Sequence, residues 1–130
     1  MVRLTKRARE LIDGKNLANV ATIMPDGSPQ VASVWVEREG DTVVINATVK
    51  RQRYLNLRRD PRVALSIFDM NDIYSEVIIR GRAIEITKKD AEEGIDRLSM
   101  KYNGRIYPDH RPKEPRVIIR IRPERIVEWT

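Results

Sequence analysis

The sequence predicts an α+β fold in which six short, mainly antiparallel strands form a closed or split β-barrel with flanking helices. Turn residues at 25–28 and 39–41 separate the first apolar segments, and these turns are too short for the crossovers of a parallel sheet. An isolated glycine, Gly81, interrupts the longest strand, as a bulge or bend in a small barrel requires. We expect residues 1–130 to form a single domain of this kind.

The first part of the chain is expected to form one helix and then three strands. Apolar side chains recur at helical spacing over residues 5–13, with Thr5 able to cap the start. Strands over 17–24 and 30–36 form a hairpin, and both faces of its second strand should be at least half buried. A third strand over 42–48 follows a tight turn, so we expect three consecutive antiparallel strands.

The middle of the chain is expected to return to strands after one short helix. This helix follows the third strand and stops at Asp60, because the residue before a proline avoids the α region. Strands are predicted over 63–68, 76–87 and 116–122, and a short extended segment follows Pro123.

A longer helix is predicted after residue 90. Thr87 and Asp90 resemble a capping box, and Ile95 and Leu98 fall at helical spacing. Residues 104–115 contain three prolines, little apolar content and the single histidine, so we expect an exposed loop with a solvated imidazole.

Composition favours an anionic partner. The chain has 25 Lys and Arg against 19 Asp and Glu, a net charge of +6, which suits nucleic acid, acidic lipid or a phosphorylated small molecule. Aromatic residues are only 5% and do not interleave with basic residues as stacking platforms do, so we expect no nucleic-acid partner. No apolar run approaches the roughly 20 residues of a membrane span, and we expect a cytoplasmic protein without a membrane partner.

The side chains exclude several kinds of catalytic site. With no cysteine and only His110, a histidine-based triad is hard to assemble and a multi-histidine zinc site is impossible, and we expect no metal site. The sequence also lacks a Gly-rich phosphate loop and a dinucleotide-binding motif. If the protein is an enzyme, an organic cofactor therefore carries the reactive group.

The basic segment at residues 48–62 is the predicted anchor for that cofactor. It lies where a strand gives way to a helix, and helix N-termini expose unpaired N–H groups that bind phosphate. The alternative is a solvated helix whose arginines serve only solubility. Trp35 is either a core residue or a surface on which a ring stacks. Tyr74 is either a rim residue or part of a pocket wall.

Several segments match one known family. They are Ala-Thr-Ile at 21–23, Asp-Gly-Ser-Pro-Gln at 26–30, Asn-Leu-Arg-Arg-Asp-Pro-Arg at 56–62, Gly81, and Arg-Ile-Arg-Pro-Glu-Arg at 120–125. With these segments the chain resembles the flavin- and deazaflavin-binding split β-barrel proteins related to pyridoxamine 5′-phosphate oxidase. It is most similar to their small deazaflavin-dependent oxidoreductases, which use coenzyme F-420. The resemblance extends over essentially the whole chain.

The resemblance implies a homodimer with one cofactor in each of two grooves at the interface. The residues implied to hold or surround the phosphate are Arg51 and Arg53, with Lys50, Gln52 and Asn56. The ring would lie along the backbone of Ser33, Val34 and Trp35 and of Ala47, Thr48 and Val49. Tyr74 would reach it from the partner chain. Relatives often carry lysine where Arg53 stands, and arginine replaces a point charge with a planar fork.

The resemblance also implies that no protein side chain acts as a nucleophile. The favoured hypothesis is direct hydride transfer between coenzyme F-420 and a small unsaturated organic substrate. The alternative is an FMN-dependent oxidase or reductase on the same scaffold, because the terminal phosphate of FMN would fit the same anchor. A third hypothesis is a non-catalytic barrel that binds a cofactor, haem or nucleic acid.

Overall fold

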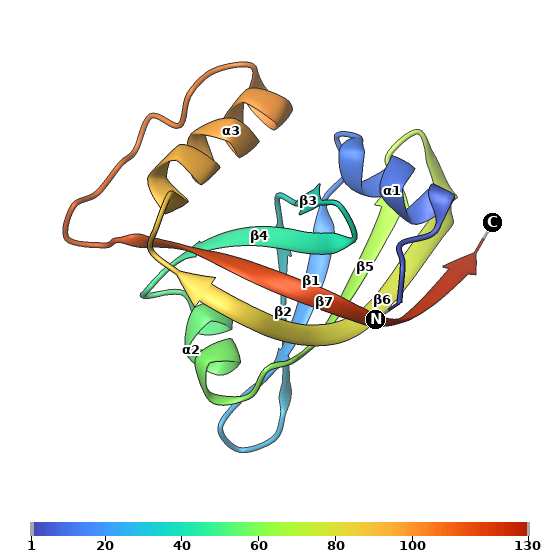
Figure 1. Cartoon of the computed structure of the whole chain (residues 1–130), viewed down its shortest axis with the longest axis horizontal. Helices are drawn as coiled ribbons and strands as arrows, with labels where there is room; N and C mark the ends of the chain where they lie inside the picture. The colour runs from blue at the N-terminus through green and yellow to red at the C-terminus, as the bar shows by residue number, and fades with distance from the viewer. Residues whose placement is uncertain (1, 130) are drawn as a thin grey trace.

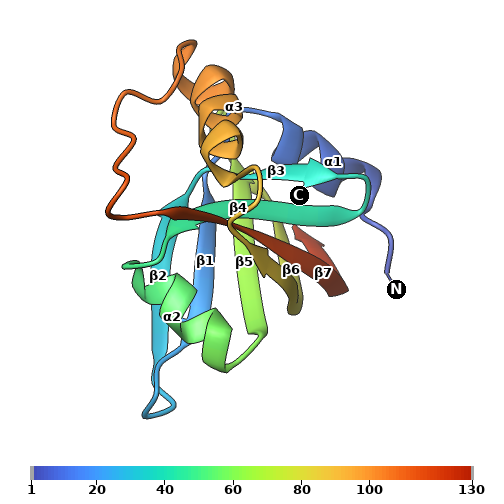
Figure 2. The same cartoon turned by 60° about the vertical axis from the view of Figure 1, so that its left-hand side comes forward.

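The strands of residues 2–129 belong to one antiparallel sheet that curls around a common core (Figures 1 and 2). The computed structural model describes residues 2–129. Its helices are α1 (Lys6–Asp13), α2 (Gln52–Arg59) and α3 (Ala91–Asn103). Its strands are β1 (Ala18–Ile23), β2 (Pro29–Val34), β3 (Glu37–Glu39), β4 (Thr42–Thr48), β5 (Arg62–Asp69), β6 (Asp72–Thr87) and β7 (Arg116–Trp129). The predicted antiparallel α+β fold is confirmed, with seven strands in place of six.

The additional strand is β3, and it changes the expected strand neighbours. Sheet order runs β2-β1-β5-β6-β7-β4-β3, so β4 pairs with β7 and β3 but not with β2. The prediction of three consecutive neighbouring strands was therefore wrong after the first hairpin. Strand β3 has only three residues, two of them Glu, and carries no apolar alternation that would predict a strand.

The sheet remains open between its two end strands. Only two residues separate the end of β2 at Val34 from the start of β3 at Glu37, yet the two strands do not pair. Strand β3 pairs only with residues 42–44, so among residues 2–129 the rest of that edge of β4 has no strand partner. The outer face of β2 is also uncovered: Val31 is 66% exposed and Ser33 is exposed, contrary to the prediction that both faces are half buried.

Helix α1 closes one end of the barrel (Figure 1). Its Leu11 and Ile12 are buried in the same core as Ile45, Leu65 and Ile119 of the strands. The helix begins as predicted, because the Thr5 hydroxyl accepts a hydrogen bond from the Ala8 N–H at 3.1 Å. The apolar stripe of α1 thus provides a lid for the strand core.

The long strands β6 and β7 bend together at Gly81. The pairing register shifts between Arg80 and Gly81, which confirms the predicted bulge, and Gly81 lies opposite Pro123. Proline has no N–H to donate, and at a bulge this absence is tolerated. Strand β7 therefore continues through Pro123 to Trp129, and the predicted break at this proline was wrong.

Helix α3 lies over the outer face of β4 and β7, where Ala91 packs with Val44 and Ile118. Its predicted capping box does not form: Asp90 has φ 61° and no side-chain cap bond. The Thr87 hydroxyl accepts instead from the N–H of Lys89 at 3.1 Å. In residues 2–129, no helix is both long enough and apolar enough to cross a membrane.

The C-terminal end of α3 fixes the link between β2 and β3. The Tyr102 hydroxyl donates to the Asn16 carbonyl at 2.5 Å, and the Val36 N–H donates to that hydroxyl at 3.2 Å. Lys101 Nζ donates to the Val36 carbonyl at 2.6 Å. Trp35 stacks on Tyr102, with ring centroids 5.4 Å apart and planes 7° apart. These contacts hold the Trp35 side chain beside the open edge of the sheet.

Candidate functional site

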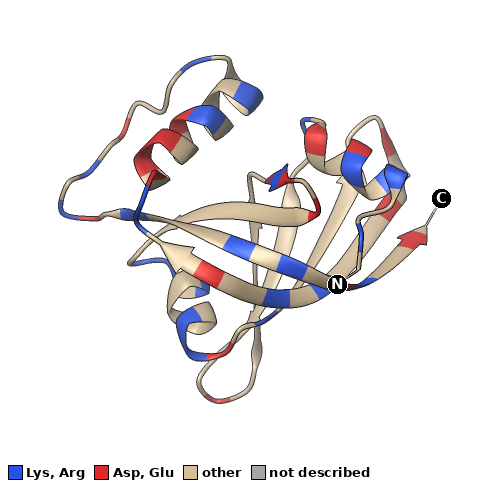
Figure 3. Cartoon of the chain, in the orientation of Figure 1, with Lys and Arg blue, Asp and Glu red and all other residues tan. Residues whose placement is uncertain are grey.

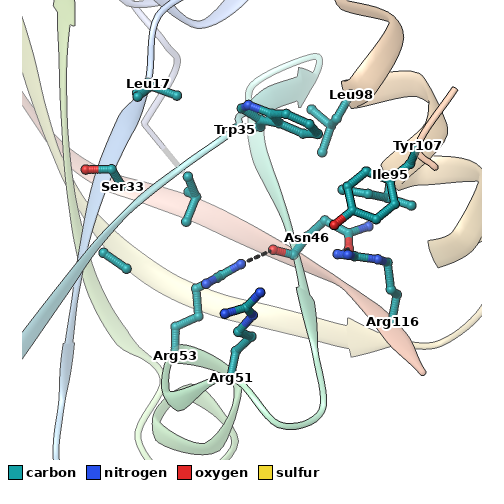
Figure 4. A pocket seen from close by; sticks show the side chains of 12 residues that line it. Leu17, Ser33, Trp35, Asn46, Arg51, Arg53, Ile95, Leu98, Tyr107 and Arg116 are labelled. Carbon is teal, nitrogen blue, oxygen red and sulfur yellow. Dashed lines mark hydrogen bonds between the residues drawn. The ribbon is translucent and has the colours of Figure 1, made fainter. Parts of the chain in front are cut away.

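A cavity of about 530 Å³ lies at this opening of the barrel (Figure 4). Strand β2 contributes Ala32, Ser33 and Val34 to its lining, and Asn46 comes from the open edge of β4. Helix α2, helix α3 and the loop before β7 supply the other walls. The separation of β2 from β4 therefore creates the cavity, because a paired strand in that position would fill it.

The basic end of the cavity is built where β4 passes into α2. The Arg51 N–H donates to the Thr48 carbonyl at 3.0 Å, which closes the turn, and Arg51 is the N-cap of α2. No side chain among residues 2–129 caps this helix start. The helix ends at Asp60 before Pro61, as predicted. The sequence thus places a helix N-terminus and two arginines at the cavity.

Arg53 is held largely out of solvent in this wall. Its Nη2 donates to the backbone carbonyl of Asn46 at 2.9 Å, whereas its buried Nε has no hydrogen-bond partner in residues 2–129. Burial, and then the positive charges of Arg51 and Arg116, together lower the pKa of Arg53 to about 10. An anion in the cavity would give Arg53 an additional hydrogen-bond acceptor and would reduce the repulsion between the positive charges of the arginines.

A third guanidinium, that of Arg116, lines the same cavity. Its Nη1 donates to Asn46 Oδ1 at 3.2 Å, and its guanidinium carbon lies 4.5 Å from the centre of the Tyr107 ring. Lys and Arg lie at the start of α2 and at the start of β7 (Figure 3). Within the described part of the chain, no carboxylate lies within ion-pair distance of the three cavity arginines. The cavity is therefore cationic.

Another part of the lining, next to Arg116, is aromatic and apolar. Trp35 meets Tyr107 edge to face, with ring centroids 6.2 Å apart and planes at 84°. Ile95 and Leu98 of α3 complete this wall. A planar ring could pack here while a phosphate attached to it reached the arginines, so the donor set fits a phosphate-bearing aromatic cofactor.

Comparison with known proteins places the chain in a family. Residues 4–130 match the family described as pyridoxamine 5′-phosphate oxidase. The chain belongs to this family. The resemblance found in the sequence is thereby confirmed, together with the split-barrel fold that it implied.

Several solved structures show the same fold. A structure described as an F-420 reductase is 30% identical, with a TM-score of 0.83, over 92% of this chain and 94% of that chain. A conserved hypothetical protein of Mycobacterium tuberculosis is 26% identical, with a TM-score of 0.75, over 99% of this chain and 86% of the other. HupZ of Group A Streptococcus, at 23% identity and a TM-score of 0.73 over 96% and 93%, shows the fold alone.

The structure brings together five of the residues that the family resemblance implied. Ser33, Val34, Trp35, Arg51 and Arg53 all line the cavity. The other implied residues lie outside this lining: Ala47, Thr48, Val49, Lys50, Gln52, Asn56 and Tyr74.

Some residues outside the lining have structural partners of their own. Asn56 is fully buried and donates to the Thr22 hydroxyl at 2.9 Å, so it links α2 to β1. The Val49 N–H donates to the Pro115 carbonyl at 3.1 Å, and Ala47 lies in the barrel core. Tyr74 is 81% exposed at the start of β6.

Seven lining residues were not predicted: Leu17, Ala32, Asn46, Ile95, Leu98, Tyr107 and Arg116. One of them carried a signal in the sequence, since Asn46 is an amide in an otherwise apolar strand. Such a residue is depleted in strand centres and needs a specific partner. The others are typical core or loop residues, and only the fold of this pyridoxamine 5′-phosphate oxidase-like chain shows their place.

The loop at 104–115 is attached to α3 through His110. Its Nδ1 lies 2.7 Å from Glu92 Oε1 and its Nε2 lies 2.8 Å from Asp96 Oδ1. The Tyr107 N–H also donates to Asp96 Oδ1, at 2.9 Å. His110 is exposed, as predicted for a surface imidazole, and its ring also contacts two carboxylates on successive turns of α3.

We expect the loop attachment to weaken as pH rises. Both ring nitrogens of His110 can donate only when the imidazole is protonated, and the bonds to Glu92 and then Asp96 raise its pKa above 6.5. Because the folded pKa is raised, this stabilisation is complete below pH 6.5 and disappears as pH rises through the folded value. An NMR titration of the only histidine gives this pKa without ambiguity. A value at or below 6.5 would contradict the two bonds, and Glu92→Gln should lower it.

Proposed function

We propose that this protein is an oxidoreductase that transfers hydride between bound coenzyme F-420 and a small unsaturated organic substrate. The observation that carries the proposal is the cavity itself, in which three arginines line the same space as Trp35 and Tyr107, and the buried Nε of Arg53 has no hydrogen-bond partner in residues 2–129. The likeness to a structure described as an F-420 reductase, at 30% identity, supports the choice of cofactor.

The cavity residues would bind and orient the cofactor. Arg51 and Arg53 would hold its phosphate, and Trp35 and Tyr107 would border its ring. When bound, the deazaflavin would supply the hydride-carrying group. Among the described residues, the cavity lining contains no Asp, Glu or His. The protein would therefore act by placing two planar molecules in contact and by excluding water.

The proposal includes a homodimer. An apolar groove of about 360 Å³ runs along β1, β5 and β6, where the half-buried Ile23 and Ala64 lie beside Pro29. Exposed apolar surface of this kind is typical of an interaction site. In the dimer, Tyr74 would contribute to the partner's cofactor groove. Sedimentation should give twice the 15.1 kDa chain mass, and a monomer at micromolar concentration would refute this part.

An FMN-dependent oxidase or reductase is the second candidate. It is favoured by the family match and by the same arginines, since FMN also ends in a phosphate. A non-catalytic barrel that binds such a cofactor would also fit the family match and would use the same arginines.

Titration of the cofactor-free protein with each cofactor separates these candidates. We expect saturable, micromolar or tighter binding of coenzyme F-420 and weaker binding of FMN, followed by the change in fluorescence. The opposite preference would move the protein to the FMN candidate, and binding of neither would reject both. If the protein binds coenzyme F-420 but no unsaturated substrate oxidises the bound, reduced coenzyme, the non-catalytic barrel would be favoured.

A further inference from the structure

We propose that Arg116 is a third ligand of the phosphate and that Asn46 is the residue that positions it. The identity of the anion as a cofactor phosphate rests on the proposed function. The arrangement of the two side chains does not, because it follows from contacts within this chain. Neither residue belongs to the basic segment at 48–62.

Asn46 makes a hydrogen bond from each of its polar side-chain atoms. It is only 6% exposed; its Oδ1 accepts from Arg116 Nη1 at 3.2 Å, and its Nδ2 donates to the Ala91 carbonyl at 3.0 Å. The carbonyl is an obligatory acceptor, so the amide oxygen must face Arg116. The fold therefore fixes which atom of Asn46 the arginine meets.

The same residue also fixes Arg53. Its backbone carbonyl lies on the open edge of β4 and accepts from Arg53 Nη2 at 2.9 Å. Asn46 thus binds one guanidinium through its backbone and a second through its side chain. Two like charges are brought to one side of the cavity by a single neutral residue (Figure 4).

Arg116 is further restrained from the loop side. The Tyr107 ring packs on the Arg116 guanidinium, with 4.5 Å between the ring centre and the guanidinium carbon. The backbone N–H of Arg116 donates to Glu92 Oε2 at 3.1 Å. These contacts limit the freedom of a long side chain before any ligand arrives. A preorganised guanidinium loses little entropy when it binds an anion.

The charge balance indicates what the three arginines bind. Arg51, Arg53 and Arg116 come from the N-cap of α2, from α2 itself and from the start of β7. The positive charges of Arg51 and Arg116 lower the pKa of Arg53, so their proximity is unfavourable without a counter-charge. A phosphate offers several acceptor oxygens and up to two negative charges. A neutral ligand would not compensate the repulsion.

The first experiment compares Arg116→Gln with a matched control, Arg122→Gln. Both positions are on β7 and both changes remove one charge, but Arg122 is exposed and outside the cavity. We expect Arg116→Gln to weaken binding of inorganic phosphate, measured by calorimetry, by about tenfold or more, as loss of a charged hydrogen bond predicts. Arg122→Gln should change it less than about twofold. Equal effects of the two changes would overturn the inference.

The second experiment tests the positioning role of Asn46. Asn46→Ala should weaken phosphate binding in the wild-type background and have no further effect when Arg116→Gln is already present. An equal loss in both backgrounds would show a general structural role and refute positioning. Asn46→Asp keeps the acceptor for Arg116 but replaces the donor to the Ala91 carbonyl with a carboxylate oxygen and adds a negative charge, so it should lower the melting temperature and abolish phosphate binding by the folded protein. Retained phosphate binding in a folded Asn46→Asp variant would also refute it.

The cofactor titration separates this inference from the proposed function. If neither coenzyme F-420 nor FMN binds, the proposed function fails, yet inorganic phosphate still tests Arg116. If a cofactor binds Arg116→Gln as tightly as wild type, the inference fails while the proposed function stands.

Discussion

Replacing Arg51 and Arg53 together with alanine should weaken cofactor binding by about 3–6 kcal/mol, the largest binding effect that we expect from this cavity. Each arginine would lose a charged hydrogen bond worth roughly 1.5–3 kcal/mol. Arg53 contributes most, because it is sequestered from water and its Nε has no other partner in residues 2–129. Fluorescence titration with coenzyme F-420 and FMN measures the loss.

A double variant outside the cavity controls for the loss of two charges. Arg58 and Lys89 are both exposed and contribute nothing to the lining, so their replacement with alanine should leave affinity within about 0.5 kcal/mol of wild type. Normal cofactor binding by the Arg51 and Arg53 variant would show that the phosphate lies elsewhere. The melting temperature of the Arg51 and Arg53 variant should remain close to wild type, because the loss of charge repulsion offsets the loss of the hydrogen bond from Arg53 to Asn46.

Gly81→Ala should destabilise the fold by about 3 kcal/mol, the largest stability effect that we expect from a single methyl group. A Cβ atom at this position would lie 2.2 Å from the carbonyl oxygen of Arg122 and 3.2 Å from the Cα atom of Pro123. Both obstacles are backbone atoms of β7, so β6 and β7 would have to separate at the bulge. Urea unfolding gives the change in free energy.

Gly94→Ala is the matched control for this substitution. Gly94 is in α3, and the nearest atoms to an added Cβ are side-chain atoms of Asn46 and Ile118 at 3.4 Å. Alanine is about 1 kcal/mol better than glycine in a helix, which offsets this close contact. We expect little net change in the free energy of unfolding of Gly94→Ala.

A loss of under 1 kcal/mol in the free energy of unfolding of Gly81→Ala would mean that β6 and β7 can readily move apart at the bulge.

Elements with a local signature could be predicted from the sequence. The N-cap of α1 at Thr5, the stop of α2 at Asp60 and the bulge at Gly81 each depend on the chemistry of a few adjacent residues. The continuation of β7 through Pro123 could not be predicted in this way. It depends on the register shift opposite Gly81, where Glu124 is the extra residue of β7; Gly81 of β6 is distant in the sequence and lies opposite this proline only in the folded sheet.

The candidate site, too, could be predicted only where its residues are close in sequence. The basic residues Arg51 and Arg53 could be predicted because they are close in sequence at the start of one helix. Their partners could not, since Arg116 meets Asn46 across 70 residues and only through the pairing of β4 with β7. Likewise, His110 could be assigned to a loop, whereas its two carboxylate partners are defined by how that loop returns along α3.

The open edge of β4 has a consequence for solubility. A strand edge with free carbonyl and N–H groups is a template on which another chain can add a strand and begin to aggregate. Arg53 already occupies the carbonyl of Asn46 at this edge, and its charge, with that of Arg51, repels a second copy of the same cationic surface. Charged residues at strand edges commonly act as gatekeepers against aggregation. The arginines of the cavity thus allow the barrel to stay open without recruiting a neighbouring chain.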